Sequence, residues 1–247
     1  MKTKIIILAA GKGTRMGSDL PKVLVELHGQ SMIKHLMKAV HDSGVDAHPI
    51  VVVSPDNKNL IEDELSAYDV VYVIQDKQLG TGHAVNCARS LVSDDYDNVL
   101  VLYGDHPFLT AKSISIFAQA EPEALTIIPT LLPNFEGWHH NFYHLGRIAR
   151  DEAGNVCGII EFKDSNDKDK EILEINMGFM CFNRKWLFNN IDNLKSENKA
   201  NEFYLTDLVK IAALQGVKIN SIMIEPRESM GINSREELAI AESLINQ

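Results

Sequence analysis

The sequence predicts an α/β protein: a Rossmann-like, mostly parallel sheet flanked by helices, followed by a smaller β-rich lobe. Apolar, β-branched runs alternate with helix-like spacing in the first half of the chain, a pattern typical of βαβ units. After residue 120 the apolar runs become shorter and are separated by turn-like or charged stretches. We therefore expect a single domain over residues 1–247, with one half at about 1–120 and a second at about 121–247 that ends in a helix.

The alternation can be followed element by element. In the first half, strands are predicted near 4–9, 49–53, 70–74 and 98–103, and helices at 32–40, 59–65 and 83–91. In the second half, strands are predicted near 124–130, 145–150, 156–161, 175–182 and 217–224, and helices at 203–215 and from Arg235 to the end. Because open parallel sheets bind ligands at the carboxyl ends of their strands, we expect the loops after the early strands to form the site.

Composition narrows the class of partner. The chain of 247 residues is 45% hydrophobic and 23% charged, as in an ordinary globular protein, and its net charge is −10. That charge argues against non-specific binding to nucleic acid or to an anionic membrane. The three cysteines form no C-x-x-C pair and no stretch approaches the length of a membrane span, so we expect a cytoplasmic protein. The oligomeric state stays open.

The first predicted strand ends in a loop with features of a phosphate-binding site. Small residues close the strand, and Gly11 and Gly13 let the backbone approach a ligand. Arg15 and Lys22 then place two cations beside open backbone amides, which together form a cradle for an anion. The spacing fits neither the dinucleotide-binding fingerprint nor the P-loop. The alternative is a glycine-rich turn without a ligand.

Two oxygen-bearing side chains are candidate metal ligands. Asp105 follows an apolar strand that ends in Tyr103 and Gly104, and a carboxylate facing a polyphosphate suits Mg²⁺. The alternative is that Asp105 caps the next helix or turn. Asn233 is a possible second ligand, and its local alternative is the N-cap of the terminal helix.

Other polar residues follow or interrupt the predicted strands. Gln75 carries an amide that can both donate to and accept from the edge of a uracil base. Gly80 and Thr81 come next, although Thr81 could simply cap the helix that follows. Glu161 and Asn176 sit in apolar runs, where a polar side chain is either satisfied internally or faces a ligand.

In this order the motifs resemble the sugar-phosphate nucleotidyltransferases, and within them the N-terminal uridylyltransferase half of the GlmU family. That family is bifunctional, an N-acetylglucosamine-1-phosphate uridylyltransferase and a glucosamine-1-phosphate acetyltransferase. The resemblance is carried by residues 8–16, 19–24, 75, 78–84, 102–105, 146–148, 158–164, 174–178, 202–207 and 231–233. The acetyltransferase β-helix is missing from the chain, so the resemblance implies neither acetyl transfer nor the family's trimer.

The resemblance implies transfer of UMP from UTP to N-acetylglucosamine-1-phosphate, with Mg²⁺ as cofactor and small molecules as partners. It also implies that the first half binds the nucleotide and the second half the sugar. Arg15 and Lys22 would be catalytic, and Asp105 and Asn233 would hold the metal. The residues that would bind the substrates are Leu8, Ala9, Ala10, Gly11, Gly13, Gln75, Gly80, Thr81, Tyr103, Gly104, Gly146, Glu161 and Asn176.

Three departures from the family pattern lie on the sugar side. Phe162 stands where the family has histidine, Met177 stands where it has threonine, and residues 136–144 form a longer segment than usual. They leave open a nucleotidyltransferase for another hexose-1-phosphate or another nucleoside triphosphate. A third alternative is a sensor of nucleotide sugars that catalyses nothing.

Overall fold

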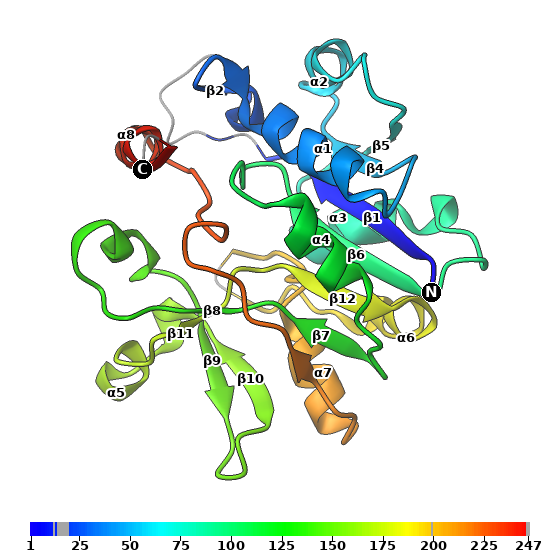
Figure 1. Ribbon diagram of the computed structural model, residues 1–247. Coiled ribbons are helices and arrows are strands. Elements are labelled where there is room, and N and C mark those ends of the chain that lie inside the picture. The colour runs from blue at the N-terminus through cyan, green and yellow to red at the C-terminus, as the bar shows by residue number, and fades with distance from the viewer. Residues whose placement is uncertain (12, 14–19, 199, 246–247) are drawn as a thin grey trace.

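A mixed sheet of seven strands forms the centre of the protein, in a computed structural model that describes residues 1–11, 13, 20–198 and 200–245 (Figure 1). The strand order is β13-β7-β12-β6-β1-β4-β5. The strands are β1 (Thr3–Leu8), β4 (Ile50–Val53), β5 (Val71–Ile74), β6 (Asn98–Tyr103), β7 (Leu125–Ile127), β12 (Met180–Asn183) and β13 (Asn220–Ser221). β12 runs antiparallel to both of its neighbours, and the other pairings are parallel. The mostly parallel sheet predicted from the sequence is confirmed.

Both faces of this sheet are buried. Along β1, the side chains of Ile5 and Ile7 join one hydrophobic core and that of Ile6 joins the other, as the alternation of a strand requires. Burial on both faces explains why the early strands are continuous apolar runs without an alternating polar face.

Helices cover each face of the sheet. α1 (Met32–Ser43), α2 (Lys58–Glu64), α4 (Ala111–Ala118) and α8 (Arg235–Ile245) supply apolar side chains to the core on the Ile5 side. α3 (Thr81–Cys87), α6 (Arg184–Asn190) and α7 (Asp207–Leu214) supply the core on the Ile6 side. The protein is therefore a three-layer α/β structure around the sheet (Figure 1).

A second, smaller sheet lies beyond one end of the central sheet (Figure 1). Among the described residues it has four strands in the order β10-β9-β11-β8, and every pairing is antiparallel. The strands are β8 (Thr130–Leu131), β9 (Arg147–Arg150), β10 (Val156–Ile160) and β11 (Glu174–Ile175). The predicted β-rich lobe is thus present, while the division of the chain near residue 120 stays a prediction.

Short elements complete the described chain. The 3₁₀ helices are η2 (Lys22–Leu24), η3 (Arg89–Leu91), η4 (Gly137–Phe142), η5 (Phe162–Asp164) and η6 (Ile191–Asn193), and the remaining short elements are α5 (Asp167–Lys170) and the hairpin strands β2 (Glu26–Leu27) and β3 (Gln30–Ser31).

Several sequence predictions differ from the structure. The strand predicted near 124–130 is divided into β7 in the central sheet and β8 in the smaller sheet. The single strand predicted at 175–182 is two strands in two different sheets, because the backbone turns at Gly178, where φ is +82°. α4 and α6 were not among the predicted helices, since each is short and follows a strand directly or through a brief loop. The strand predicted at 217–224 is reduced to β13 and an isolated bridge between Thr130 and Ile224.

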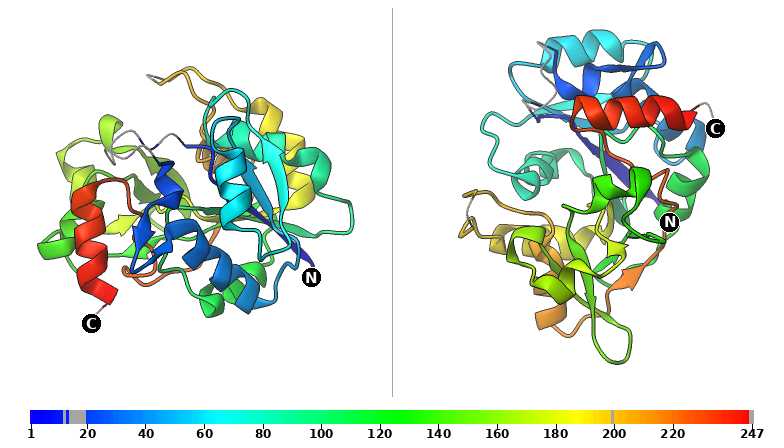
Figure 2. Two further views of the ribbon diagram at one scale, coloured as in Figure 1. Left: turned by 90° about the horizontal axis from the view of Figure 1, so that it is seen from above. Right: turned by 90° about the vertical axis from the view of Figure 1, so that its left-hand side faces the viewer.

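The last helix of the chain packs against the hairpin that precedes α1. α8 lies across the β2–β3 hairpin, and the ring of His28 is 3.3 Å from the carbonyl oxygen of Glu242 (Figure 2). The last helix therefore packs on the part of the chain that directly follows the predicted phosphate loop. Among the described residues, no helix is both long and apolar enough to span a membrane.

Candidate active site

A cavity of about 1300 Å³ opens between the carboxyl edge of the central sheet and the smaller sheet. Seven of the substrate-binding and metal residues predicted from the sequence line it: Thr81, Tyr103, Asp105, Gly146, Glu161, Asn176 and Asn233. They come from parts of the chain more than 150 residues apart, which the fold brings to one surface. The cavity is large enough for a nucleotide-sized ligand, since small-molecule sites commonly occupy about 300–1,000 Å³.

The centre of the site is an ammonium group held between two oxygens. Nζ of Lys22 forms a short ion pair with Oδ2 of Asp105 and donates to Oδ1 of Asn233 at 2.8 Å. Asp105 comes from the loop after β6, Lys22 begins η2, and Asn233 precedes α8. The predicted catalytic lysine and both predicted metal ligands are therefore one cluster.

The charges around Asp105 keep it ionised. Burial alone would raise the pKa of this carboxyl group, but Lys22 and His106 outweigh that effect and hold the pKa well below its usual value. Nδ1 of His106 lies 3.0 Å from Oδ1, so each carboxylate oxygen has its own nitrogen partner. The backbone N–H of Ile232 donates to the carbonyl of Asp105 at 3.0 Å and ties the Asn233 segment to it.

Neither Asp105 nor Asn233 caps a helix, which was the alternative considered for each. The N-cap of α4 is Thr110, whose hydroxyl accepts from the N–H of Ser113, and Asp105 points to Lys22 instead. Before α8, the hydroxyl of Ser234 accepts from the N–H of Glu237, while the side chain of Asn233 points to Lys22.

The end of β1 lies directly beside this centre. The N–H of Gly104 donates to the carbonyl of Leu8 at 3.0 Å, and a Cβ added to Gly104 would lie 3.6 Å from Cβ of Ala9. The amide of Gln78 donates to the carbonyl of Ala10 at 2.5 Å. The small residues at the strand end thus allow two loops to meet at close range.

The two glycines of the predicted phosphate loop differ in their surroundings. Gly13 has φ +62°, and a Cβ there would overlap Cβ of Lys22 at 2.3 Å. Gly11 is exposed and has open space around the position of a Cβ. Arg15 lies outside the described residues, so its predicted catalytic role stays a prediction.

The predicted base-binding segment packs against the loop before α7. Gly80 has φ +103°, and a Cβ there would lie 2.6 Å from the carbonyl oxygen of Phe203. The amide of Gln75 donates to the carbonyl of Gly80 at 3.0 Å and lies 3.1 Å from Nδ1 of His83. The hydroxyl of Thr81 accepts from the N–H of Leu205 at 3.0 Å. The capping role considered for Thr81 is wrong, since the N-cap of α3 is Gly80.

Three predicted sugar-side residues form the opposite wall. The N–H of Asn176 donates to the carbonyl of Gly146 at 2.9 Å. A Cβ on Gly146 would lie 3.5 Å from Oε2 of Glu161. The hydroxyl of Thr206 lies 3.4 Å from Oε1 of Glu161. Burial raises the pKa of this carboxyl group, and nearby Asp207 and Asp164 add to the increase. Glu161 is therefore a partly desolvated acceptor that faces the cavity.

Tyr103 also lines the cavity. Its ring packs tightly on Gly178, where a Cβ would lie 3.0 Å from the ring and the hydroxyl oxygen. Burial, with the charge of Asp105, raises the pKa of the Tyr103 phenol far above its usual value. The side chain is therefore a neutral wall of the cavity. The N–H of Gly178 is in turn held by Oδ1 of Asn176 at 3.1 Å.

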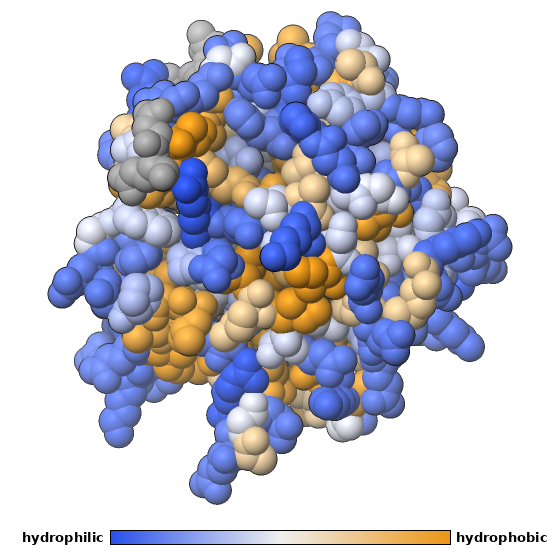
Figure 3. Space-filling view, in the orientation of Figure 1, coloured by the Kyte–Doolittle hydropathy of each residue, from blue (hydrophilic) through white to orange (hydrophobic). Residues whose placement is uncertain are grey.

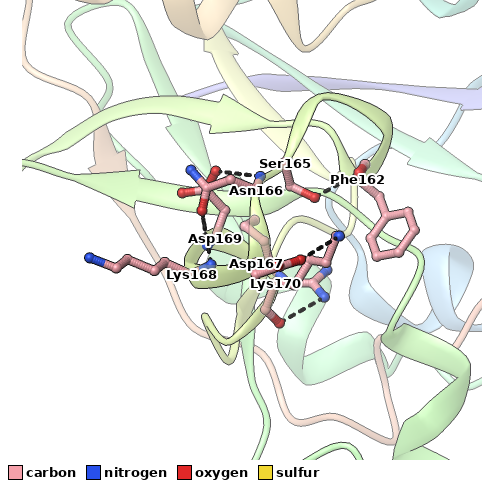
Figure 4. A network of polar contacts seen from close by, with 8 residues as sticks. Phe162, Ser165, Asn166, Asp167, Lys168, Asp169 and Lys170 are labelled. Atoms are coloured by element: carbon pink, nitrogen blue, oxygen red, sulfur yellow. Dashed lines mark hydrogen bonds and ion pairs between the residues drawn. The ribbon is translucent and has the colours of Figure 1, made fainter.

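Phe162 lines the cavity, and hydrogen bonds order the segment that follows it. The hydroxyl of Ser165 donates to the carbonyl of Phe162, and Asn166 and Asp169 form a capping box at the start of α5 (Figure 4). The ring of Phe162 lies edge-on to His144, with centroids 4.9 Å apart. In the space-filling view, apolar side chains gather over this lobe, in the region of β8 and β11 (Figure 3).

A buried arginine supports the aromatic wall. Arg147 has no exposed surface, and its guanidinium donates to the carbonyls of Leu145, Tyr143 and Lys170. It also lies 4.9 Å from the ring centroid of Phe135. Since arginine can satisfy several carbonyls while stacking on aromatic rings, it links the 136–144 segment to β9.

Sequence reasoning missed three residues of the site. His106 pairs with Asp105, Thr206 contacts Glu161, and Glu237 accepts from the N–H of Asn233 at 2.5 Å. A titratable residue directly after Asp105 was a usable signal for His106. The other two contacts join residues that only the fold brings together.

The side-chain oxygens at the centre are suitable ligands for a divalent cation. Asp105 and Asn233 direct one oxygen each at a single point, and a positively charged ammonium group occupies that point. One carboxylate and one amide oxygen, completed by phosphates and water, is the pattern that Mg²⁺ favours. Among the described residues, no group of three or more His, Cys, Asp or Glu side chains could hold a metal by itself.

Comparison with known proteins points to one family. The model of the MobA-like NTP transferase domain matches residues 5–205. The chain is 40% identical over 242 residues to the bifunctional protein GlmU of Caldicellulosiruptor saccharolyticus, covering 98% of this chain and 51% of that protein. It is 40% identical over 248 residues to the bifunctional protein GlmU of Heliobacterium modesticaldum, covering 99% of this chain and 52% of that protein.

A third relative is shorter. The bifunctional protein GlmU of Desulfotalea psychrophila is 35% identical over 240 residues, which is 96% of this chain and 69% of that protein. The chain thus spans about half the length of the first two relatives and about two thirds of the third. These matches confirm the resemblance that the sequence motifs carry.

Proposed function

This chain belongs to the family of MobA-like NTP transferase domains and is a nucleotidyltransferase of the GlmU uridylyltransferase type, and from that membership we propose its substrates. We propose that it transfers UMP from UTP to N-acetylglucosamine-1-phosphate and releases pyrophosphate. The product would be UDP-N-acetylglucosamine, and the reaction would require Mg²⁺.

One observation carries this proposal: a charged centre and a polar sugar-side wall face the same cavity. Asp105 and Asn233 of the centre and Glu161 and Asn176 of the wall line the cavity, and the ammonium group of Lys22 pairs with the first two. A nucleotidyltransferase must hold a triphosphate and a second phosphate in line, so it needs cations in the middle and hydroxyl-binding groups on one side. The cavity offers both.

The chemistry needs positioning and charge more than proton transfer. The phosphate of a sugar 1-phosphate is already an oxyanion, so it can attack the α-phosphorus without a strong general base. Lys22 would bind phosphate oxygens and stabilise the charge that builds up as pyrophosphate leaves. Arg15, in the preceding loop, is proposed to assist at the leaving group.

Asp105 and Asn233 would hold the metal, which would orient and polarise the α-phosphate. Glu161, which is partly dehydrated, would accept hydrogen bonds from sugar hydroxyls. Gly146 and Asn176 would line the sugar, and Tyr103 with Gly104 would separate it from the nucleotide. The segment Leu8–Ala10 with Gly11 and Gly13, and the group Gln75, Gly80 and Thr81, would bind the uridine nucleotide.

The test is pyrophosphate release with UTP and Mg²⁺ against four sugar 1-phosphates: N-acetylglucosamine, glucosamine, glucose and N-acetylgalactosamine. We expect rapid release with N-acetylglucosamine-1-phosphate and little with the others. Release only with another sugar would refute the proposed acceptor while keeping nucleotidyl transfer. Replacing UTP by dTTP, CTP or ATP in the same assay tests the proposed base.

A further inference from the structure

The same ammonium group contacts both side chains that are assigned to the metal. Nζ of Lys22 reaches Oδ2 of Asp105 and, at 2.8 Å, Oδ1 of Asn233. We propose that Lys22 is a placeholder for the divalent cation: it occupies the metal position in the free enzyme and must leave before a metal can bind there. This inference rests on the metal assignment within the proposed function.

Two oxygens that converge on one point repel each other unless a cation lies between them. A backbone hydrogen bond of 3.0 Å from the N–H of Ile232 to the carbonyl of Asp105 holds the two segments side by side, which keeps both side chains close to the same point. Lys22 supplies the cation, and Asp105 is almost fully buried, with 7% of its surface exposed. The free enzyme thus keeps its metal ligands aligned without a metal.

The ammonium and a metal exclude each other at this position. They would compete for the same oxygens, and a divalent ion a few ångströms from a lysine ammonium would be strongly repelled. A triphosphate resolves the conflict, because its oxygens offer Lys22 a new anionic partner. Lysine suits this exchange, since it carries a compact charge on a flexible stem and can move between partners.

The consequence is that metal and nucleotide enter together. In the free enzyme, binding of a divalent cation must displace Lys22 with no new partner for it. With a triphosphate present, the displaced ammonium pairs with phosphate. The centre should therefore bind a metal weakly by itself and firmly as part of the metal–nucleotide complex.

The experiment titrates Mn²⁺ alone onto the free enzyme and measures bound ion by electron paramagnetic resonance. Lys22→Met should bind Mn²⁺ at least about tenfold more tightly than the wild-type protein, because removing a unit charge a few ångströms away has an effect of that order even when screened. Lys163→Met is the matched control, since Lys163 lines the same cavity as Asp105 and Asn233. It should bind Mn²⁺ like the wild type.

A double variant locates the effect. Lys22→Met combined with Asp105→Asn should lose the gain, which would assign the tighter binding to this centre. Lys22→Gln serves as a second neutral variant if Lys22→Met does not fold, and it should show the same gain. Equal Mn²⁺ affinity in folded Lys22 variants and wild type would overturn the proposal, as would a gain that survives in the double variant.

The outcome is separable from the proposed function. Turnover of N-acetylglucosamine-1-phosphate by the wild-type protein, without a gain in Mn²⁺ affinity in the Lys22 variants, would overturn the placeholder role alone. A gain in Mn²⁺ affinity in the Lys22 variants, together with no turnover of any sugar 1-phosphate by the wild-type protein, would support the placeholder role and refute the proposed reaction.

Discussion

Nζ of Lys22 lies 2.8 Å from Oδ1 of Asn233, although 211 residues separate the two in sequence. The contact joins the start of η2 to the segment that leads into α8. One segment from early in the sequence and one from late in it therefore contribute to the charged centre, and α8 packs on the β2–β3 hairpin that follows η2 (Figure 2). A change that loosens α8 should reach the site through Asn233.

Replacing Asp105 by Asn should reduce turnover by about 100-fold to 1,000-fold, the usual cost of losing one transition-state electrostatic contact. The substitution keeps the shape of the side chain but removes the charge that balances Lys22 and would bind the metal. Pyrophosphate release at saturating substrates measures the effect. Asp95→Asn, on an exposed loop, is the control and should retain normal turnover. Near-normal activity in Asp105→Asn would contradict the assignment of the centre.

Gly80→Ala should destabilise the protein by more than the cost of its backbone conformation. A positive φ costs a non-glycine residue about 1–3 kcal/mol, and at Gly80 the added Cβ would also meet the backbone of Phe203 at 2.6 Å. Gly154→Ala is the matched control, because its φ is +84° and it has open space around the Cβ. Urea unfolding should show a larger loss for Gly80→Ala, and equal losses would contradict the close approach seen here.

Glu161 should make stability fall as pH rises. Burial raises the pKa of its carboxyl group above the unfolded value, so the folded state binds more protons than the unfolded state between the two values. Glu161→Gln removes this penalty. The difference in Tm between Glu161→Gln and wild type should become more positive from about pH 4 to pH 7, and Glu152→Gln, on an exposed turn, should show no such trend. A difference that stays constant with pH would contradict the dehydrated position of Glu161.

Phe162→Ala should weaken binding of the sugar phosphate more than binding of the nucleotide. The ring forms part of the cavity wall and packs edge-on against Tyr143, with centroids 5.4 Å apart. Loss of this contact should raise KM for the sugar 1-phosphate by about tenfold, a typical effect of shortening an apolar side chain in a pocket. Steady-state kinetics with each substrate varied in turn should show a KM for UTP within about twofold of wild type. Equal increases in both constants would remove Phe162 from the sugar side.

The strands of the first half show how well local sequence predicts secondary structure. Each of the four strands predicted in the first half is present within a residue or two. In β1, β4 and β6, burial on both faces demands an unbroken apolar run. The stretch 175–182 has the same apolar character, yet it divides at Gly178 between two sheets. Hydropathy alone does not report such a turn when the residues on both sides are buried.

In the site, too, some residues were predictable from local motifs and others only from the folded structure. The types and order of residues identified the family and predicted Asp105, Asn233 and Lys22 as members of one site, since these motifs recur in that family. His106, Thr206 and Glu237 escaped because their roles are hydrogen bonds to residues that only the folded chain places within reach.

The sequence by itself determined the α/β class and the strands of the parallel core, because apolar periodicity is a local property of the chain. It also indicated the family, through the resemblance of its ordered motifs. Only the tertiary structure decided that the ammonium of Lys22 lies between Asp105 and Asn233, and that Arg147 supports the aromatic wall beside Phe162. Such contacts depend on how three layers pack and on which charges burial forces to pair, and no local pattern encodes these distances.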